Sequence, residues 1–197
     1  MIKFLFILIA IAVFGGISYY SYHANPNPTE ILQDKTTTFT VEDLGLQFDY
    51  KVGLTGYVLE ERVSALAGTL VRTLTLFQTE DKIKGILEGG EGPAVIAIQV
   101  FNNPQGESPE TWANENVQYS NINLKQGEIS KTSIGGAPAI RYMADGLYAS
   151  EIAVFTKGEY AYIITGQFID ADSDIRRDFV PFLDSIRFME EKAAISN

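Results

Sequence analysis

Four consecutive segments in the C-terminal half of the chain have the alternating or fully apolar patterns of β-strands. They span residues 128–134, 137–144, 147–156 and 160–169. The pair Asp145-Gly146 between the second and third segments is typical of a tight hairpin, and a Lys-Gly-Glu turn at 157–159 separates the third from the fourth. This pattern predicts an antiparallel meander, so the chain has to bury its core against a sheet.

Further strands are predicted before and after this meander. They lie at residues 38–41, 46–50, 57–63, 70–78 and 94–101, with a short closing strand at 186–188. The acidic, glycine-containing stretch 80–92 is predicted as a loop that can contain a helical turn.

Two helices are predicted among these strands. The first begins at Ser108, whose hydroxyl can cap it, and continues through Pro109 to about residue 119, with Trp112 on its buried side. The second spans residues 173–185, where apolar residues recur at helical spacing. Antiparallel strands with helices inserted between them define an α+β domain, which we assign to residues 38–189, and 190–197 form a polar, disordered tail.

The chain begins with an uncharged apolar run at residues 4–17, and a tyrosine-rich stretch extends this run to residue 22. As a helix, residues 4–22 would be about 28 Å long, close to the thickness of a bilayer's hydrocarbon core. A signal peptide cleaved after Ala24 is the alternative, but bulky Tyr22 stands where the peptidase needs a small residue, which favours an uncleaved transmembrane helix.

The positively charged Lys3 precedes this helix, which places the N-terminus in the cytoplasm and residues 25–197 outside. We therefore assign residues 1–24 to a cytoplasmic start and membrane anchor. Residues 25–37, which contain two Asn-Pro pairs, form a linker to the domain. The predicted location is the cell membrane, with the C-terminal domain extracytoplasmic.

The formal net charge is −10. A surface this acidic repels phosphate backbones, so we exclude nucleic acid as a partner and expect cations or a basic partner to be attracted. The chain has no cysteine, and its single histidine, His23, lies beside the predicted anchor. This inventory excludes thiol nucleophiles, Cys-type zinc sites and a Ser-His-Asp triad in the domain, so we predict no catalytic residues and no cofactor.

Asp170, Asp172 and Asp174 have the spacing of the first half of a calcium-binding loop. A complete loop would require glycine and glutamate where this chain has Ile175 and Pro181, so the three acids are only weak candidates for a metal site. The alternative is that these acids cap the N-terminus of the last helix, where negative charge is favourable.

Four tyrosines with an arginine among them lie on neighbouring predicted strands and form a candidate ligand or partner surface. They are Tyr142, Tyr148, Tyr160, Tyr162 and Arg141. Tyrosines at a spacing of two more often belong to a core, but they can also line a pocket, because each offers an apolar ring and a polar hydroxyl.

Several motifs of the chain resemble those of the PsbP-like family, the relatives of the extrinsic PsbP protein of photosystem II. They are GLQFDY (45–50), AVIAIQVFNNP (94–104), SPETW (108–112), GGAPAIRYMADG (135–146), AVFTKGEYAYIITGQF (153–168) and FVPFLDSIRF (179–188). Lys51-Val52-Gly53 departs from the family, which often has Pro-x-x-Trp there. The resemblance implies an α-β-α sandwich built on a central antiparallel sheet, acting as a non-catalytic accessory or assembly factor outside a membrane.

These observations together predict a membrane-tethered, extracytoplasmic binding or accessory domain. Its partner, a protein or a small molecule, is not specified by the sequence. Two other functions stay open: a cell-envelope hydrolase that uses carboxylates alone, and a calcium-responsive envelope module.

Overall fold

The computed structural model describes residues 34–64, 69–85 and 92–189. The predicted anchor at 1–24, most of the predicted linker and the predicted tail at 190–197 lie outside these residues. None of the helices in the described ranges combines the length and the apolar character that crossing a bilayer requires.

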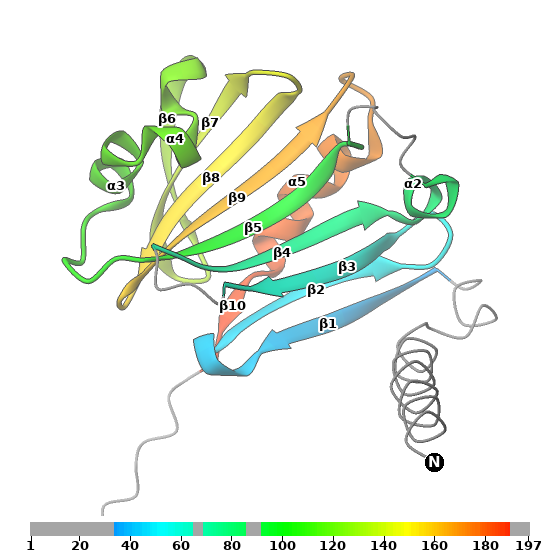
Figure 1. Cartoon of the computed structure of the whole chain (residues 1–197), viewed down its shortest axis with the longest axis horizontal. Helices are drawn as coiled ribbons and strands as arrows, with labels where there is room; N and C mark the ends of the chain where they lie inside the picture. The colour runs from blue at the N-terminus through cyan, green and yellow to red at the C-terminus, as the bar shows by residue number, and fades with distance from the viewer. Residues whose placement is uncertain (1–33, 65–68, 86–91, 190–197) are drawn as a thin grey trace, which may run out of the picture.

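A seven-stranded antiparallel sheet forms the centre of the domain (Figure 1). Its strands in spatial order are β3 (Tyr57–Val63), β4 (Leu70–Gln78), β5 (Val95–Asn102), β9 (Tyr160–Phe168), β8 (Ala149–Lys157), β7 (Ala137–Asp145) and β6 (Lys125–Ile134). The predicted four-strand meander is confirmed as β6–β9, whose neighbours pair in sequence order. The Asp145-Gly146 hairpin has a longer loop than predicted, because Asp145 itself pairs with Ala149 and leaves three residues in the turn.

A smaller antiparallel sheet contains β1 (Lys35–Val41), β2 (Leu46–Val52) and β10 (Arg187–Phe188), in the order β1-β2-β10. The 3-10 turn η2 (Glu42–Leu44) joins its first two strands, and Gly45 follows with φ +59°, a conformation that glycine adopts without strain. Because β1 begins at Lys35, the folded domain starts inside the stretch 25–37 that was predicted as linker.

Helices cover both faces of the large sheet, which makes three layers (Figure 1). One face carries α5 (Asp174–Ser185), and the other carries α3 (Pro109–Glu115), α4 (Val117–Ser120) and the 3-10 turn η3 (Ile122–Leu124). The helix predicted from Ser108 is capped as expected, since the Ser108 hydroxyl accepts the Thr111 N–H at 3.2 Å. It is interrupted at Asn116, however, and a further short helix, α2 (Thr79–Lys84), occupies part of the predicted loop.

The two faces bury separate apolar cores. Phe179, Phe182 and Leu183 of α5 pack into a core that also contains Phe48 of the small sheet. Trp112 packs into the core on the opposite face and is 2% exposed, as the sequence predicted. The helix α5 lies very close to the sheet at Gly166, where an added Cβ would meet the Phe179 ring at 2.5 Å.

Candidate binding site

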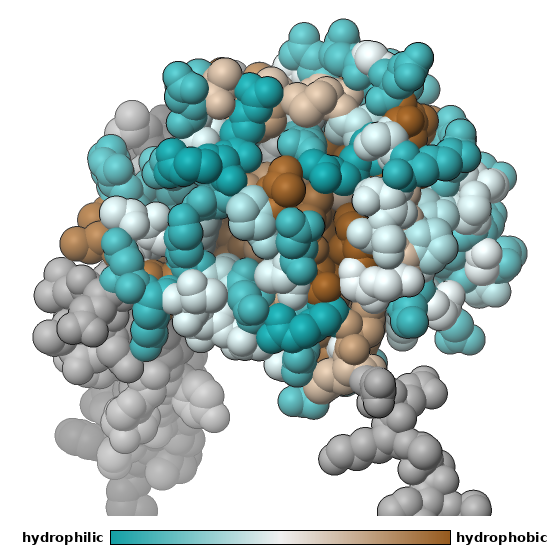
Figure 2. All heavy atoms as spheres, turned by 180° about the vertical axis from the view of Figure 1, so that it is seen from behind, coloured by the Kyte–Doolittle hydropathy of each residue, from teal (hydrophilic) through white to brown (hydrophobic). Residues whose placement is uncertain are grey.

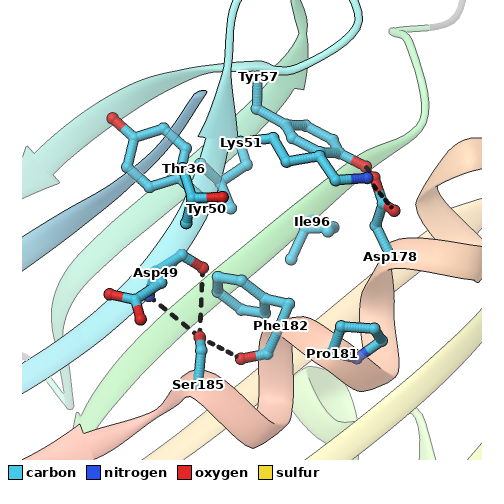
Figure 3. Close-up of a pocket in the computed structure, with 11 residues that line it drawn as sticks. Thr36, Asp49, Tyr50, Lys51, Tyr57, Ile96, Asp178, Pro181, Phe182 and Ser185 are labelled. Atoms are coloured by element: carbon cyan, nitrogen blue, oxygen red, sulfur yellow. Dashed lines mark hydrogen bonds and ion pairs between the residues drawn. The ribbon is translucent and has the colours of Figure 1, made fainter. Parts of the chain in front are cut away.

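A pocket of about 160 Å³ lies where α5, the small sheet and the first strands of the large sheet meet (Figure 3). Its lining residues are Thr36, Asp49, Tyr50, Lys51, Tyr57, Leu76, Ile96, Asp178, Pro181, Phe182 and Ser185. Leu76, Ile96 and Phe182 are buried and belong to the α5-side core, so the interior of the pocket is apolar.

At one end of the pocket, the Asp178 carboxylate on α5 links three elements (Figure 3). It accepts the Lys51 ammonium of β2 at 2.8 Å and the Tyr57 hydroxyl of β3 at 3.1 Å. Burial raises the pKa of Tyr57 far above its usual value, and the negative charge of Asp178 raises it further, so the phenol stays protonated and acts as a donor.

At the other end, Ser185 fastens the C-terminus of α5 to β2 (Figure 3). The oxygen of its hydroxyl group accepts the Asp49 N–H at 3.0 Å, and its O–H donates to the Phe182 carbonyl at 2.7 Å. The Asp49 carboxylate is engaged elsewhere, because it accepts from Arg187 at 3.0 Å and from the Thr38 hydroxyl at 2.6 Å. Those two hydrogen bonds hold the pKa of Asp49 below its usual value.

Both carboxylates of the pocket are engaged by other residues. A carboxylate hydrolase needs one carboxyl group that stays protonated near neutral pH, and it needs a second one facing it. In the pocket, Asp49 has a lowered pKa and is bound to Arg187, and Asp178 is occupied by Lys51 and Tyr57.

The five residues predicted as one ligand surface are not brought together. Tyr142 and Tyr162 are 3% and 1% exposed and belong to the cores on opposite faces of the sheet. Tyr160 is half-buried beside Tyr162, and the Tyr148 hydroxyl donates to the Gly92 carbonyl at 2.5 Å. Arg141 forms an ion pair with Glu151 of the neighbouring strand.

The three aspartates before α5 have separate structural contacts. The Asp170 carboxylate accepts the Asp172 N–H at 3.1 Å, and Asp174 pairs with Arg177 one turn along the helix. The residue that caps α5 is Ser173, which accepts the Arg176 N–H. Within the part of the chain that the structure describes, no three acidic or histidine side chains are grouped so that they could hold a metal ion.

A second, shallower hollow of about 390 Å³ lies over β3 and β4 and contains no residue of the first. Its lining residues are Glu60, Arg62, Val63, Ser64, Leu70, Arg72, Thr73, Thr75 and Phe77. Six of these nine residues carry a charge or a hydroxyl group, and Val63, Leu70 and Phe77 contribute apolar side chains.

The pocket itself was missed at the level of sequence, because its residues come from β1 through β5 and from α5. One signal for it was present. Asp178 lies beside the stripe of α5 that contains Ile175, Phe179 and Phe182, and a carboxylate next to a buried stripe requires a partner.

No protein-family model and no curated protein sequence matches this chain. Among solved structures, the chain is similar to the cyanobacterial PsbP protein, CyanoP, from Synechocystis sp. PCC 6803, known from a solution structure. The similarity has a TM-score of 0.50 at 10% sequence identity and covers 84% of this chain and 98% of that one. The chain therefore has a PsbP-like α+β fold built on a central seven-stranded antiparallel sheet.

Proposed function

We propose that this chain is a non-catalytic accessory domain that binds a partner through the pocket between α5 and β2. Residues 4–22 tether it to a membrane, with the domain on the extracytoplasmic side. The observation that carries the proposal is the pocket itself, an apolar hollow whose two ends are held by hydrogen bonds to α5. The PsbP-like fold supports the proposal, because the chain shares this fold with cyanobacterial PsbP and the resemblance of its motifs to the PsbP-like family implies an accessory role.

The geometry favours binding because hydrogen bonds to α5 hold both ends of the pocket. Lys51 and Tyr57 hold the N-terminal half of α5 through Asp178, and Ser185 holds its C-terminus through the backbone of Asp49. A site fixed in this way loses little conformational entropy when a partner binds.

The absence of cysteine from the sequence makes a direct test practical, because one introduced cysteine is unique. Thr36 lies at the pocket and is exposed, so a photo-crosslinker attached to Thr36→Cys in intact cells should capture the partner. Thr132→Cys provides the matched control, because Thr132 is exposed on β6, at the opposite edge of the large sheet.

The same variants test the orientation of the domain. A membrane-impermeant maleimide added to intact cells should label Thr36→Cys and Thr132→Cys if the domain is extracytoplasmic.

Two outcomes would contradict the proposal. Equal capture of a partner protein by the crosslinker at both positions would contradict a site at the pocket. Hydrolysis of cell-envelope polysaccharide by the purified chain would contradict a non-catalytic role.

A further inference from the structure

We infer that the occupant of the pocket is a cationic segment of a partner protein that inserts a single apolar side chain, phenylalanine or leucine in size, between α5 and β2. This inference rests on the accessory function proposed above and specifies its partner. Three properties of the pocket carry it: its volume, its chemistry from floor to rim, and the charge around it.

The volume separates a side chain from a free small molecule. Pockets for cofactors and other organic ligands usually measure about 300–1,000 Å³. This one measures about 160 Å³. An apolar cavity of roughly 150 Å³ in another protein accommodates benzene, which is the ring of a phenylalanine side chain. The pocket is therefore too small for an ordinary cofactor and has the size of one anchoring side chain.

The chemistry of the pocket has the arrangement of an anchor site at a protein interface. The buried side chains of Leu76, Ile96 and Phe182 offer an apolar floor, and Lys51 is 51% exposed at the rim. Strong protein–protein contacts place one apolar residue in such a desolvated pocket and surround it with polar contacts that exclude water. The α5 side of the molecule otherwise shows only separate apolar areas between polar ones (Figure 2).

The charge around the pocket favours a cationic segment. Around the pocket, Asp49 is paired with Arg187 and Asp178 with Lys51, while Asp184 on α5 is exposed and adds a negative charge that no ion pair among the described residues offsets. The whole chain carries a net charge of −10. A second copy of this chain would therefore be repelled at long range, whereas a segment bearing arginine or lysine would be attracted.

Lys51 can give way to such a segment. Lys51 is half exposed at the rim, whereas the Asp178 side chain is only 14% exposed, so the carboxylate needs a cationic partner but the lysine itself is free to move into solvent. A guanidinium from the partner can then approach the Asp178 carboxylate, while the Tyr57 hydroxyl keeps its hydrogen bond to the second oxygen.

The test uses the full chain in lipid nanodiscs, with methyl groups of isoleucine and leucine labelled for NMR. The probes are three acetylated and amidated tripeptides: Arg-Phe-Arg, Glu-Phe-Glu and Arg-Gly-Arg. Arg-Phe-Arg should shift the methyl signals of Ile96 and Leu76, and it should bind at least about tenfold more tightly than either other peptide, because only it combines a buried ring with favourable charge.

Two matched variants locate the effect. Thr36→Trp places a large ring at the mouth of the pocket and should weaken Arg-Phe-Arg binding by about tenfold or more, the value of one buried ring. Thr132→Trp on β6 should leave binding unchanged. Equal binding of Arg-Gly-Arg and Arg-Phe-Arg, an unresponsive Ile96 methyl, or equal effects of both variants would overturn the inference.

The outcomes also separate this inference from the accessory function. If the crosslinker at Thr36→Cys captures a protein but Ile96 does not respond to Arg-Phe-Arg, the accessory function stands and the cationic anchor is wrong. A small molecule retained by the purified chain, displaced by Thr36→Trp and not by Arg-Phe-Arg, would likewise overturn the anchor.

Discussion

The two faces of β3 and β4 each border a hollow, and the two hollows differ in what lines them. On the α5 side, the pocket has Leu76 on its floor and Tyr57 at one end. On the other side, the larger hollow is lined by Glu60, Thr73 and Thr75, and Lys82 closes over Glu60 in an ion pair. The larger hollow also contains Phe77, but it lies among charged and hydroxyl-bearing side chains, whereas the floor of the smaller hollow consists of buried core residues.

The difference follows from the period of two along each strand. In β4, Leu74 and Leu76 point to the α5 side and are at most 1% exposed, while Thr73 and Thr75 point to the other side. Among the described helices, only the short α2 reaches that second side of β3 and β4, through Lys82 over the Phe77 ring, because α3 and α4 lie over the other part of the sheet (Figure 1). A large hollow is therefore a weaker candidate for a binding site than a small one whose floor consists of packed core side chains.

The largest expected effect tests whether the two cores are independent. Trp112→Ala removes the largest side chain of the core under α3 and should lower the free energy of unfolding by about 3–5 kcal/mol. Binding of Arg-Phe-Arg at the pocket should not change, because Trp112 has no contact with the α5-side core. Urea denaturation followed by circular dichroism measures the first quantity, and NMR titration of the folded variant measures the second. Loss of peptide binding in the folded variant would break the comparison between the two faces.

The next effect concerns the close contact of α5 with the sheet. Gly166→Ala would place a Cβ 2.5 Å from the Phe179 ring, which is fully buried and has no space to move. We expect a loss of about 1–3 kcal/mol in the free energy of unfolding, typical of overpacking. Gly92→Ala is the control, because an added Cβ there meets nothing within 4 Å.

Trp112 is the only tryptophan of the chain, so its fluorescence in Gly166→Ala reports on the face away from α5. If the two faces unfold as one unit, fluorescence and circular dichroism will show the same transition. An earlier transition by circular dichroism would show that the α5 face unfolds first.

The sequence predicted the strands well because their patterns are local. The limits of β3 and β4 agree with prediction and Ser108 caps its helix as expected, whereas the cap of α5 is Ser173 and not one of the aspartates. The break at Asn116 was missed, since its cause is local geometry that the apolar spacing does not reveal. There the Asn116 backbone leaves the helical range, with φ −116° and ψ 48°, while its N–H and its side-chain amide both donate to the Trp112 carbonyl at 3.0 Å.

The candidate sites were predicted less well because they depend on register. Tyr142 pairs with Ile152, whereas Tyr162 pairs with Phe155, so the two tyrosines project from opposite faces. The sequence shows which segments are strands but not which residue lies opposite which. The pocket is harder still, because Thr36 and Ser185 are brought together only by the packing of the small sheet on α5.

A smaller effect compares two tyrosines with matched burial on the two faces. Tyr57 and Tyr142 are 4% and 3% exposed, and their hydroxyls donate to the Asp178 carboxylate and the Ser120 carbonyl, respectively. Each change to phenylalanine should cost about 1–2 kcal/mol of unfolding free energy, because each leaves an acceptor short of one hydrogen bond. Urea denaturation at pH 7 measures both. Only Tyr57→Phe should alter peptide binding.

The contribution of Tyr142 to the free energy of unfolding should also depend on pH. Burial raises the pKa of Tyr142 to about 12 in the folded state, above its ordinary value of 10.0. The stability that this shift represents is fully present below pH 10 and is lost as the pH rises towards 12. The difference in stability between the native chain and Tyr142→Phe should therefore shrink over that range. A difference that stays constant between pH 9 and 12 would contradict the assignment.

The smallest effect on stability concerns the two lysines that belong to the two hollows. Lys51 pairs with Asp178 at the pocket, Lys82 pairs with Glu60 over β3, and their side chains are 51% and 41% exposed. Lys51→Met and Lys82→Met should each change the free energy of unfolding by less than about 1 kcal/mol, because exposed ion pairs contribute little.

The two variants should differ in peptide binding. Lys51→Met frees the Asp178 carboxylate for the cationic probe and should tighten the binding of Arg-Phe-Arg severalfold, and raising the salt concentration should reduce this gain. Lys82→Met should have no such effect, since its carboxylate partner Glu60 lies on the face of the sheet away from the pocket. Equal tightening by both variants would mean that the probe responds to net charge alone, and the distinction between the two hollows would then be lost.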